Sequence, residues 1–280
     1  MADRLPSYFY SSENVFFNHI VILMIRVISM SCSKKRVNKI LNTMLAVSLF
    51  LPAFAFSSVT MMGSRIIYPS DAPSMNVEFS NKDLFPYVVQ TWLDDGDNES
   101  TPVTGKAPFI ASPAIFKIAS NNGQVLRISY TGQKNLPQDR ESLFYFNFLQ
   151  IPPVNAAGED SQQKNKMLVM LKNRIKVFYR PVDIAQKIGQ LAEHISVTSS
   201  VKAAGTTLQI KNNSPFYLSI ASVKIKNKNK IYSQPADMLA PFSQGNVEFK
   251  KMQIMKNDTA VIEYVNDQGA IVSYEYGINP

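Results

Sequence analysis

Apolar and polar residues alternate with a period of two in a series of short runs that starts near residue 65. The runs are rich in β-branched and aromatic residues, and turn-forming residues separate them at intervals of roughly ten residues. Successive side chains of a strand point to opposite faces, so this rhythm is typical of antiparallel sandwiches. The predicted strands are 65–69, 75–81, 87–95, 125–131, 142–151 and the run 166–181, followed by 194–200, 207–212, 217–225, 245–251, 259–267 and 270–276.

Six predicted strands precede the segment 181–190 and six follow it, which makes this segment the natural domain boundary. About a hundred residues on each side are enough for one sandwich. The pattern therefore predicts an all-β protein of two β-sandwich domains, at 56–184 and 185–280. Trp92, in the third predicted strand, is expected in the core of the first sandwich.

The run 166–181 combines two different patterns. Every residue from Met167 to Leu171 is apolar, so an extended chain would be apolar on both faces there. The residues from 174 onward alternate instead between cations and apolar side chains, which indicates one buried and one cationic face. A central strand covered on both faces by its own protein would explain the apolar half. A strand that is covered by another polypeptide would explain it equally well.

The N-terminal region has the three-part form of a secretory signal. Cations at residues 34–39 precede an apolar stretch from Ile40, which ends in the small-residue pattern Ala53-Phe54-Ala55. This pattern predicts residues 1–55 as extension and signal, with cleavage after Ala55. Pro52 and the shortness of the apolar stretch count against a membrane anchor. Met30 is an alternative translation start to Met1.

Charge and cysteine content narrow the class of protein. Of the formal net charge of +8, half comes from residues 1–55, which hold six cations and two anions. The surplus on the remainder is small and does not imply a nucleic-acid partner. The single cysteine, Cys32, lies before the predicted cut, so the exported chain would have no disulfide.

Residues that usually perform catalysis are scarce. His194 is the one histidine after residue 55, and no glycine-rich phosphate loop is present, which argues against zinc and nucleotide binding. The acidic residues from Asp94 to Glu99 have the pattern of a solvated loop. We therefore expect no enzyme activity, no metal and no cofactor. Four alternating lysines (Lys224, Lys226, Lys228, Lys230) favour an exposed hairpin protected against edge pairing over a polyanion site.

Two long motifs, LPQDRESLFYFNFLQIPP at 136–153 and RIKVFYRP at 174–181, resemble those of PapD-like periplasmic pilus chaperones. Three shorter matches occur in the same order: GSRIIYPS at 63–70, NNSPFYLSI at 212–220 and YVNDQGA at 264–270. The resemblance implies two immunoglobulin-like domains set at an angle with a cleft between them, acting in the periplasm without nucleotide or metal. The short connection 154–166 resembles the short-loop subgroup of the family.

The resemblance also implies a function for the apolar run. Such chaperones bind pilus (fimbrial) subunits whose sandwich lacks its last strand, fill the gap with alternate apolar side chains, and deliver the subunits to an outer-membrane usher. The motif position assigns this donor-strand role to Met167, Val169 and Leu171. Main-chain hydrogen bonds give affinity and side-chain pockets give register in such strand addition.

Family position also assigns roles to charged residues. Arg65 and Lys176 would hold the C-terminal carboxylate of the subunit, with Arg174 as a nearby alternative cation; from the residues alone, they could be ordinary surface cations. Glu141, Arg180 and Asp267 would form ion pairs that join the domains. The free form could self-associate to cover its apolar run. The alternative to a chaperone is an extracellular two-domain binding or adhesin module without a folding role, and the sequence identifies neither the subunits nor the usher.

Overall fold

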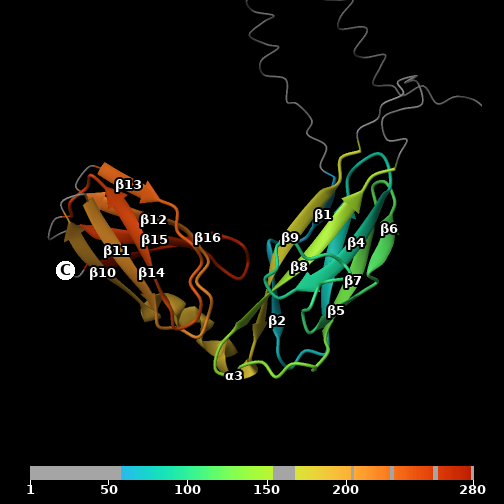
Figure 1. The fold of residues 1–280 in the computed structure, drawn as a ribbon, viewed down its shortest axis with the longest axis horizontal. Coiled ribbons are helices and arrows are strands. Elements are labelled where there is room, and N and C mark those ends of the chain that lie inside the picture. Colours follow the sequence, from blue (N-terminus) through green and yellow to red (C-terminus); the bar gives the residue numbers. More distant parts are fainter. Residues whose placement is uncertain (1–57, 154–167, 203–204, 228–229, 255–257, 279–280) are drawn as a thin grey trace, which may run out of the picture. The chain divides into compact units, whose positions relative to one another are not determined.

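The computed structural model describes residues 58–153, 168–202, 205–227, 230–254 and 258–278. Almost all regular structure in these ranges is β-strand, arranged in four sheets (Figure 1). The all-β, two-domain prediction is therefore confirmed. No helix among the described residues is long and apolar enough to span a membrane. The predicted signal and its cleavage site lie outside these ranges.

The first sandwich consists of a four-stranded sheet in the order β1-β3-β7-β5 and a five-stranded sheet in the order β2-β9-β8-β4-β6. All neighbours are antiparallel except β2 and β9, which run parallel. The strands are β1 (Val59–Met61), β2 (Arg65–Pro69), β3 (Met75–Asn81), β4 (Tyr87–Asp94), β5 (Phe109–Ser112), β6 (Ile115–Ile118), β7 (Gly123–Tyr130), β8 (Ser142–Ile151) and β9 (Leu171–Arg180).

The second sandwich follows a short helical segment, α3 (Val182–Ala185) and the 3-10 helix η1 (Gln186–His194). It has a three-stranded sheet, β10-β11-β14, and a four-stranded sheet, β13-β12-β15-β16. The strands are β10 (Ile195–Lys202), β11 (Gly205–Asn212), β12 (Ile220–Asn227), β13 (Lys230–Gln234), β14 (Gln244–Lys250), β15 (Thr259–Val265) and β16 (Ile271–Gly277).

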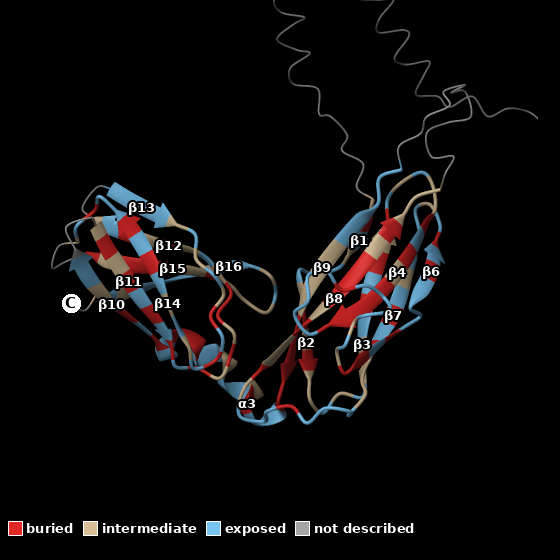
Figure 2. Cartoon of the chain, viewed as in Figure 1, coloured by how far each residue is buried: buried red, intermediate tan, exposed pale blue. Residues whose placement is uncertain are grey.

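Each sandwich has its own apolar core, built from alternate residues of its strands (Figure 2). In the first sandwich Phe144, Phe146 and Phe148 of β8 point inward, and the rings of Phe146 and Phe148 contact that of Phe79 at centroid distances of 6.2 and 5.1 Å. Fully buried aromatic side chains contribute large areas of apolar surface, so these contacts account for much of the stability of this domain.

The two sandwiches share a corner device in which a buried asparagine satisfies loop carbonyls. The Nδ2 of Asn81, the last residue of β3, donates to the carbonyl of Phe85 at 2.9 Å, and the Nδ2 of Asn212, the last residue of β11, donates to that of Phe216 at 2.7 Å. Both asparagines are fully buried. A buried amide with its hydrogen bonds made stabilises the corner, whereas an unpaired one would destabilise it.

All twelve predicted strands are present, with ends that differ from the prediction by a few residues; the largest difference is in β9, which begins at Leu171 instead of residue 166. Four further strands of the described ranges (β1, β5, β6 and β13) were not predicted. Each of them has three to five residues and lies at the edge of a sheet, so its alternation is too short to stand out.

The exposed hairpin expected at the lysine series is formed by β12 and β13, although no strand bounds were predicted for its second arm, β13, which lies at the sheet edge. Lys224 forms an ion pair with Glu263 and Lys226 with Glu275, while Lys228 lies outside the described residues. These cross-strand pairs support the interpretation of an exposed, solvated hairpin face.

We predict that Phe146→Ala destabilises the first sandwich by about 3–5 kcal/mol, because it removes a fully buried ring and leaves a cavity. Val125→Ala is the control: this residue is half exposed on β7, and we expect a change within about 0.5 kcal/mol. The measurement is urea unfolding followed by the fluorescence of Trp92, the single tryptophan of the chain. Equal effects of both substitutions would contradict the assigned core.

Candidate functional site

The side chains of β9 divide between two faces. Ile175, Val177 and Tyr179 pack into the core of the first sandwich. Arg174 and Lys176 therefore lie on the opposite, outer face of the five-stranded sheet. The alternation predicted for this half of the run is present, with one apolar and one cationic face.

The apolar half of the run is exposed. Leu168, Val169 and Met170 precede β9 and have exposed fractions of 47, 60 and 51%, and Leu171 at the start of the strand has 49%. The strand begins at Leu171 because its last partner on β8 is Gln150, one residue from the end of that strand. The first sandwich therefore does not bury these side chains. Met167 lies outside the described residues.

The outer edge of β9 is paired along half of its length. β2 runs beside it from Lys176 to Arg180, with Arg65 opposite Lys176. From Leu171 to Ile175, β9 pairs with β8 on one side, and no described strand pairs with it on the other. We call this segment, residues 171–175, the free edge of β9. It ends where β2 begins, at the register pair of Arg65 and Lys176.

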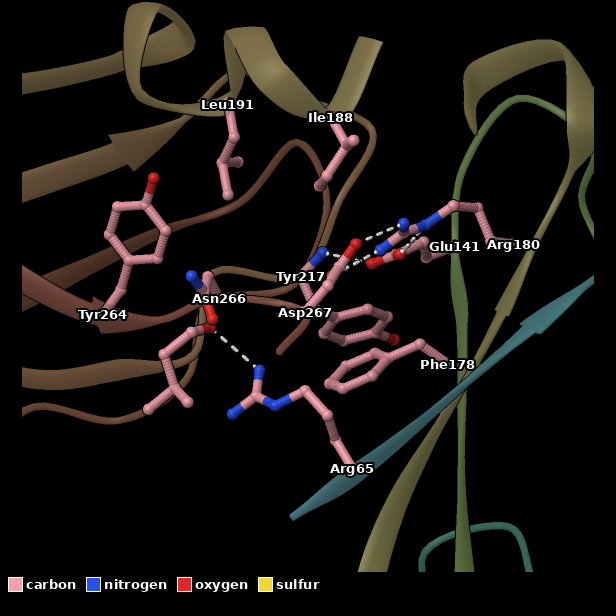
Figure 3. A pocket seen from close by; sticks show the side chains of 11 residues that line it. Arg65, Glu141, Phe178, Arg180, Ile188, Leu191, Tyr217, Tyr264, Asn266 and Asp267 are labelled. Carbon is pink, nitrogen blue, oxygen red and sulfur yellow. Dashed lines mark hydrogen bonds and ion pairs between the residues drawn. The ribbon is translucent and has the colours of Figure 1, made fainter. Parts of the chain in front are cut away.

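Arg65 and Lys176 are thus neighbouring cations on one side of the sheet. Arg65 donates from Nη1 to the carbonyl of Val265 at 2.8 Å, and its guanidinium lies over the ring of Phe178 (Figure 3). Its buried Nε has no hydrogen-bond partner in the described structure. Among the described residues, none accepts a hydrogen bond from the Lys176 ammonium. Both side chains are partly buried.

The surroundings of these two cations disfavour their charges. Burial lowers the pKa of Arg65, in spite of the attraction of Asp267 and Glu141. Burial, and in second place the repulsion by Arg65, lowers the pKa of Lys176. An anion bound between the two would stabilise the charged forms that burial and repulsion disfavour, and would so raise both pKa values. The pair can therefore bind a carboxylate or a similar group through charge-assisted hydrogen bonds.

Arg174, the alternative cation, is already engaged. Its Nη2 donates to Oδ1 of Asp94 at 2.5 Å, and its guanidinium stacks on the ring of Tyr145 at 3.6 Å. Asp94 also accepts hydrogen bonds from the Gly96 amide at 2.9 Å, the Ser100 hydroxyl at 2.8 Å and Nδ2 of Asn147 at 2.6 Å. The prediction that Asp94 belongs to a solvated loop is wrong, because it ends β4 with its side chain buried beneath these donors.

Trp92 also occupies a different place from the predicted one. It is buried, but it lies on the outer face of the sheet, outside the apolar core cluster that contains its neighbour Leu93. Its indole N–H donates to the Ser100 hydroxyl at 3.0 Å, and the Lys172 ammonium lies over its ring. The loop after β4 covers this face, which explains how an outward-facing tryptophan is buried.

Arg180, at the end of β9, connects the two sandwiches. Its Nε donates to Oε1 of Glu141 at 2.7 Å, and its two terminal nitrogens donate to the Asp267 carboxylate at 2.6 and 2.9 Å (Figure 3). Oε2 of Glu141 accepts the backbone N–H of Tyr217 at 2.8 Å. The structure thus brings the three predicted ion-pair residues together. Burial raises the pKa of Glu141, which the attraction of Arg180 offsets in part.

These residues border a small pocket, which Arg65, Phe178 and residues 264–267 also line; Lys176 is not part of its lining (Figure 3). Gly269, in the turn between β15 and β16, has a φ of +83°, a conformation that favours glycine. A Cβ at Gly269 would lie 2.6 Å from the Ser64 hydroxyl, so glycine also permits this close approach beside Arg65.

Sequence reasoning missed the group around Asp94. Asp94, Asn147 and Arg174 come from three different strands, and only the register of β4, β8 and β9 brings them together. The local signal near Asp94 is a run of acidic residues, which is equally typical of a solvated loop. The apolar residues Trp92 and Leu93 directly precede Asp94, so the strand pattern could have indicated that Asp94 ends a strand.

Comparison with known proteins agrees with this architecture. Residues 58–185 match the family model of the pili and flagellar-assembly chaperone PapD N-terminal domain, and residues 190–276 match that of the pili assembly chaperone PapD C-terminal domain. Together the two matches span most of the chain and both sandwiches.

Individual relatives match over nearly their whole length. The probable fimbrial chaperone YadV of Escherichia coli is 33% identical over 229 residues, which cover 80% of this chain and 93% of the relative. The chaperone protein HifB of Haemophilus influenzae is 34% identical over 227 residues, covering 80 and 90%. The chaperone protein PapD of Escherichia coli is 29% identical over 229 residues, covering 81 and 89%.

Solved structures give the same result. The crystal structure of the YadV chaperone superposes with a TM-score of 0.65 at 29% identity, covering 79% of this chain and 99% of that one. The CupB2 chaperone of Pseudomonas aeruginosa superposes with a TM-score of 0.62 at 26% identity, covering 78 and 100%. With both domain models matched and relatives above 30% identity aligned over most of their length, this chain belongs to the PapD family of pili assembly chaperones.

Proposed function

We propose that this chaperone binds pilus subunits in the periplasm by lending them the apolar run before and within β9, and that it passes them to an outer-membrane usher. The observation that carries the proposal is the free edge of β9, which joins an exposed apolar run to a pair of neighbouring cations. Export through the predicted signal, with cleavage after Ala55, is part of the proposal.

The free edge offers unpaired main-chain groups to an incoming strand. A subunit strand could add beside residues 171–175, in line with β2 on the same side of β9. For its C-terminal end to reach Lys176, the added strand must run parallel to β9. The start of β2 at Arg65 then leaves no room for the strand to continue. The terminus of the subunit would therefore stop beside the two cations.

The apolar side chains would supply the hydrophobic part of the affinity. Met167, Val169 and Leu171 alternate along the chain, so in an extended conformation they point to one face and can enter the open core of a subunit. Each such side chain stabilises the complex by about 1.5–3 kcal/mol before ordering costs. The half-exposed state of Val169 and Leu171 in the free protein supports this role. Exposed apolar surface also supports self-association of the free form.

Arg65 and Lys176 would hold the C-terminal carboxylate of the subunit. Their positions in register and the absence of an acceptor for Lys176 among the described residues support this assignment. A fixed end determines which subunit side chains meet the apolar run. A slip of one residue would turn every side chain to the wrong face.

The ion pairs of Arg180 with Glu141 and Asp267 would keep the second sandwich against the first near this anchor. Val265, whose carbonyl accepts the hydrogen bond from Arg65, lies two residues before Asp267. We infer a structural role for these three residues, without direct contact to the subunit. Membership of the short-loop subgroup stays a prediction, because the connection 154–166 lies outside the described residues.

We predict that Arg65→Ala and Lys176→Ala each weaken subunit binding about 10- to 100-fold, because each removes a charge-assisted hydrogen bond of about 1.5–3 kcal/mol. The measurement is recovery of a co-expressed pilin with the tagged chaperone from the periplasm. Lys117→Ala, which removes an exposed cation from β6 of the same domain, should recover as much pilin as the parent. Full recovery with both anchor variants would refute the carboxylate anchor.

We predict that Val169→Asp abolishes pilin recovery and leaves the melting temperature of the chaperone unchanged, because the side chain is exposed in the free protein. Ile231→Asp is the matched control, since Ile231 is equally exposed on β13 of the second sandwich. If Val169→Asp melted at a much lower temperature, the run would belong to the core of its own protein and the proposal would be wrong.

We predict that Arg180→Met costs more stability than Asp267→Asn. Removing the arginine leaves the buried Glu141 carboxylate without its partner, which costs about 3–5 kcal/mol. The Asp267 side chain is 28% exposed, so water replaces part of what Arg180 supplied. Urea unfolding followed by circular dichroism checks the order. The reverse order would show that Glu141 does not depend on Arg180.

A further inference from the structure

We propose that Asp94 selects the register of the bound subunit, because it occupies Arg174 and so prevents this cation from serving as a second carboxylate anchor. This inference rests on the proposed function, since it presupposes a subunit carboxylate held by Arg65 and Lys176. It assigns Asp94 a positioning role without contact to the subunit.

The error that must be prevented is a slip of two residues. A slip of one residue turns every side chain of the added strand to the opposite face, so the loss of apolar contacts opposes it. A slip of two residues keeps the faces and changes only which pocket each side chain meets. Arg174 and Lys176 lie on the same face of β9, about 7 Å apart along the strand. A free Arg174 would therefore offer the slipped carboxylate an equivalent cation.

The contacts of Arg174 remove this alternative. Its Nη2 donates to Asp94 at 2.5 Å, its Nη1 donates to the Asn98 side chain, and its guanidinium plane is stacked on Tyr145. The Asp94 side chain is 1% exposed and that of Arg174 is 21% exposed, so water weakens this ion pair little. Asp94 thus neutralises the positive charge of Arg174 at hydrogen-bond distance, and a subunit carboxylate is only weakly attracted to Arg174.

The carboxylate of Asp94 is built to remain charged. Gly96 and Arg174 donate to Oδ1, while Ser100 and Asn147 donate to Oδ2. Burial acts to raise the pKa of Asp94, but these hydrogen bonds outweigh burial and lower it overall. The acid therefore stays ionised at neutral pH and keeps its hold on Arg174.

The sheet register shows that Asp94 bonds to one of two cations within its reach, Arg174 and not Lys176. Asp94 lies opposite Tyr145, and Tyr145 lies opposite Lys176, so Asp94 and Lys176 belong to the same row across the sheet. Asp94 nevertheless bonds diagonally to Arg174, and no described residue accepts a hydrogen bond from Lys176. Of the neighbouring cations Arg174 and Lys176, the first is thus compensated by Asp94, and the second, beside Arg65, is left for a ligand.

Disulfide trapping can report the register. Leu171→Cys gives the exported chain a single thiol, because Cys32 lies before the predicted cut. The probes are two short synthetic peptides of alternating apolar and polar residues with a free C-terminal carboxylate. One carries a cysteine opposite residue 171 in the anchored register, and the other carries it two residues away. Amide-ended copies of both are the controls, and mass spectrometry identifies the products.

With Asp94 intact, we expect the first peptide alone to be trapped, with the acid form favoured about tenfold or more over the amide. Lys176→Ala should remove this preference without yielding the shifted product. Adding Asp94→Asn to Lys176→Ala should make the shifted product the major one and restore the preference for the acid. Arg174→Gln, added to this double variant, should abolish the shifted product and the preference for the acid form. A merely structural role of Asp94 would not predict this result.

Two results would overturn the inference while the proposed anchor stands. The first is a shifted product in Lys176→Ala with Asp94 intact, an arm that does not depend on how well Asp94→Asn folds. The second is the lack of a shifted product in a double variant whose melting temperature and circular dichroism match those of Lys176→Ala. If the parent itself does not distinguish acid from amide, the proposed carboxylate anchor fails, and this inference fails with it.

Discussion

The incomplete pairing of β9 is the constraint on which the rest of the site depends. β8 pairs with this strand from Leu171 to Tyr179, but β2 begins only at Lys176. A strand with one unpaired edge and apolar residues beyond its start is usually an aggregation hazard. In this protein the unpaired stretch is bounded on one side by Arg65, so the place where a foreign strand must end is defined by the fold itself.

Charge on the outer face of this sheet is distributed unevenly. Arg174 is held by the buried Asp94, and Arg180 by the buried Glu141 and the partly exposed Asp267. Arg65 and Lys176, in adjacent positions between them, have no acid in hydrogen-bond contact among the described residues. Compensated arginines stiffen the sheet and the junction of the sandwiches. A bound anion would therefore stabilise the charges of Arg65 and Lys176, which no carboxylate of the described residues contacts.

Much of this architecture could be predicted from the sequence. Period-two alternation identified the long strands, because inward-facing residues such as Phe144, Phe146 and Phe148 leave a clear pattern. The pairing of Arg65 with Lys176 came from resemblance to a family, since nothing local relates residues so distant in the chain. Short edge strands such as β1 and β5 carry too few alternations to be recognised.

The misplacements of Asp94 and Trp92 have a common physical origin. Both residues lie on the outer face of the sheet, where an ordinary sandwich is solvated and a tryptophan would be out of place. The loop after β4 covers this face and turns it into a second, polar interior around Ser100. Alternation along a strand tells which residues share a face, but it cannot tell that a loop will cover that face.

The asparagine corners have a consequence for how the chain acquires its structure. In each sandwich the bond joins an asparagine to a carbonyl four residues later, Asn81 to Phe85 and Asn212 to Phe216. Contacts between near neighbours in the chain close quickly and at small entropic cost. Each sandwich thus has a short-range contact of its own, and closing that contact does not require the other sandwich.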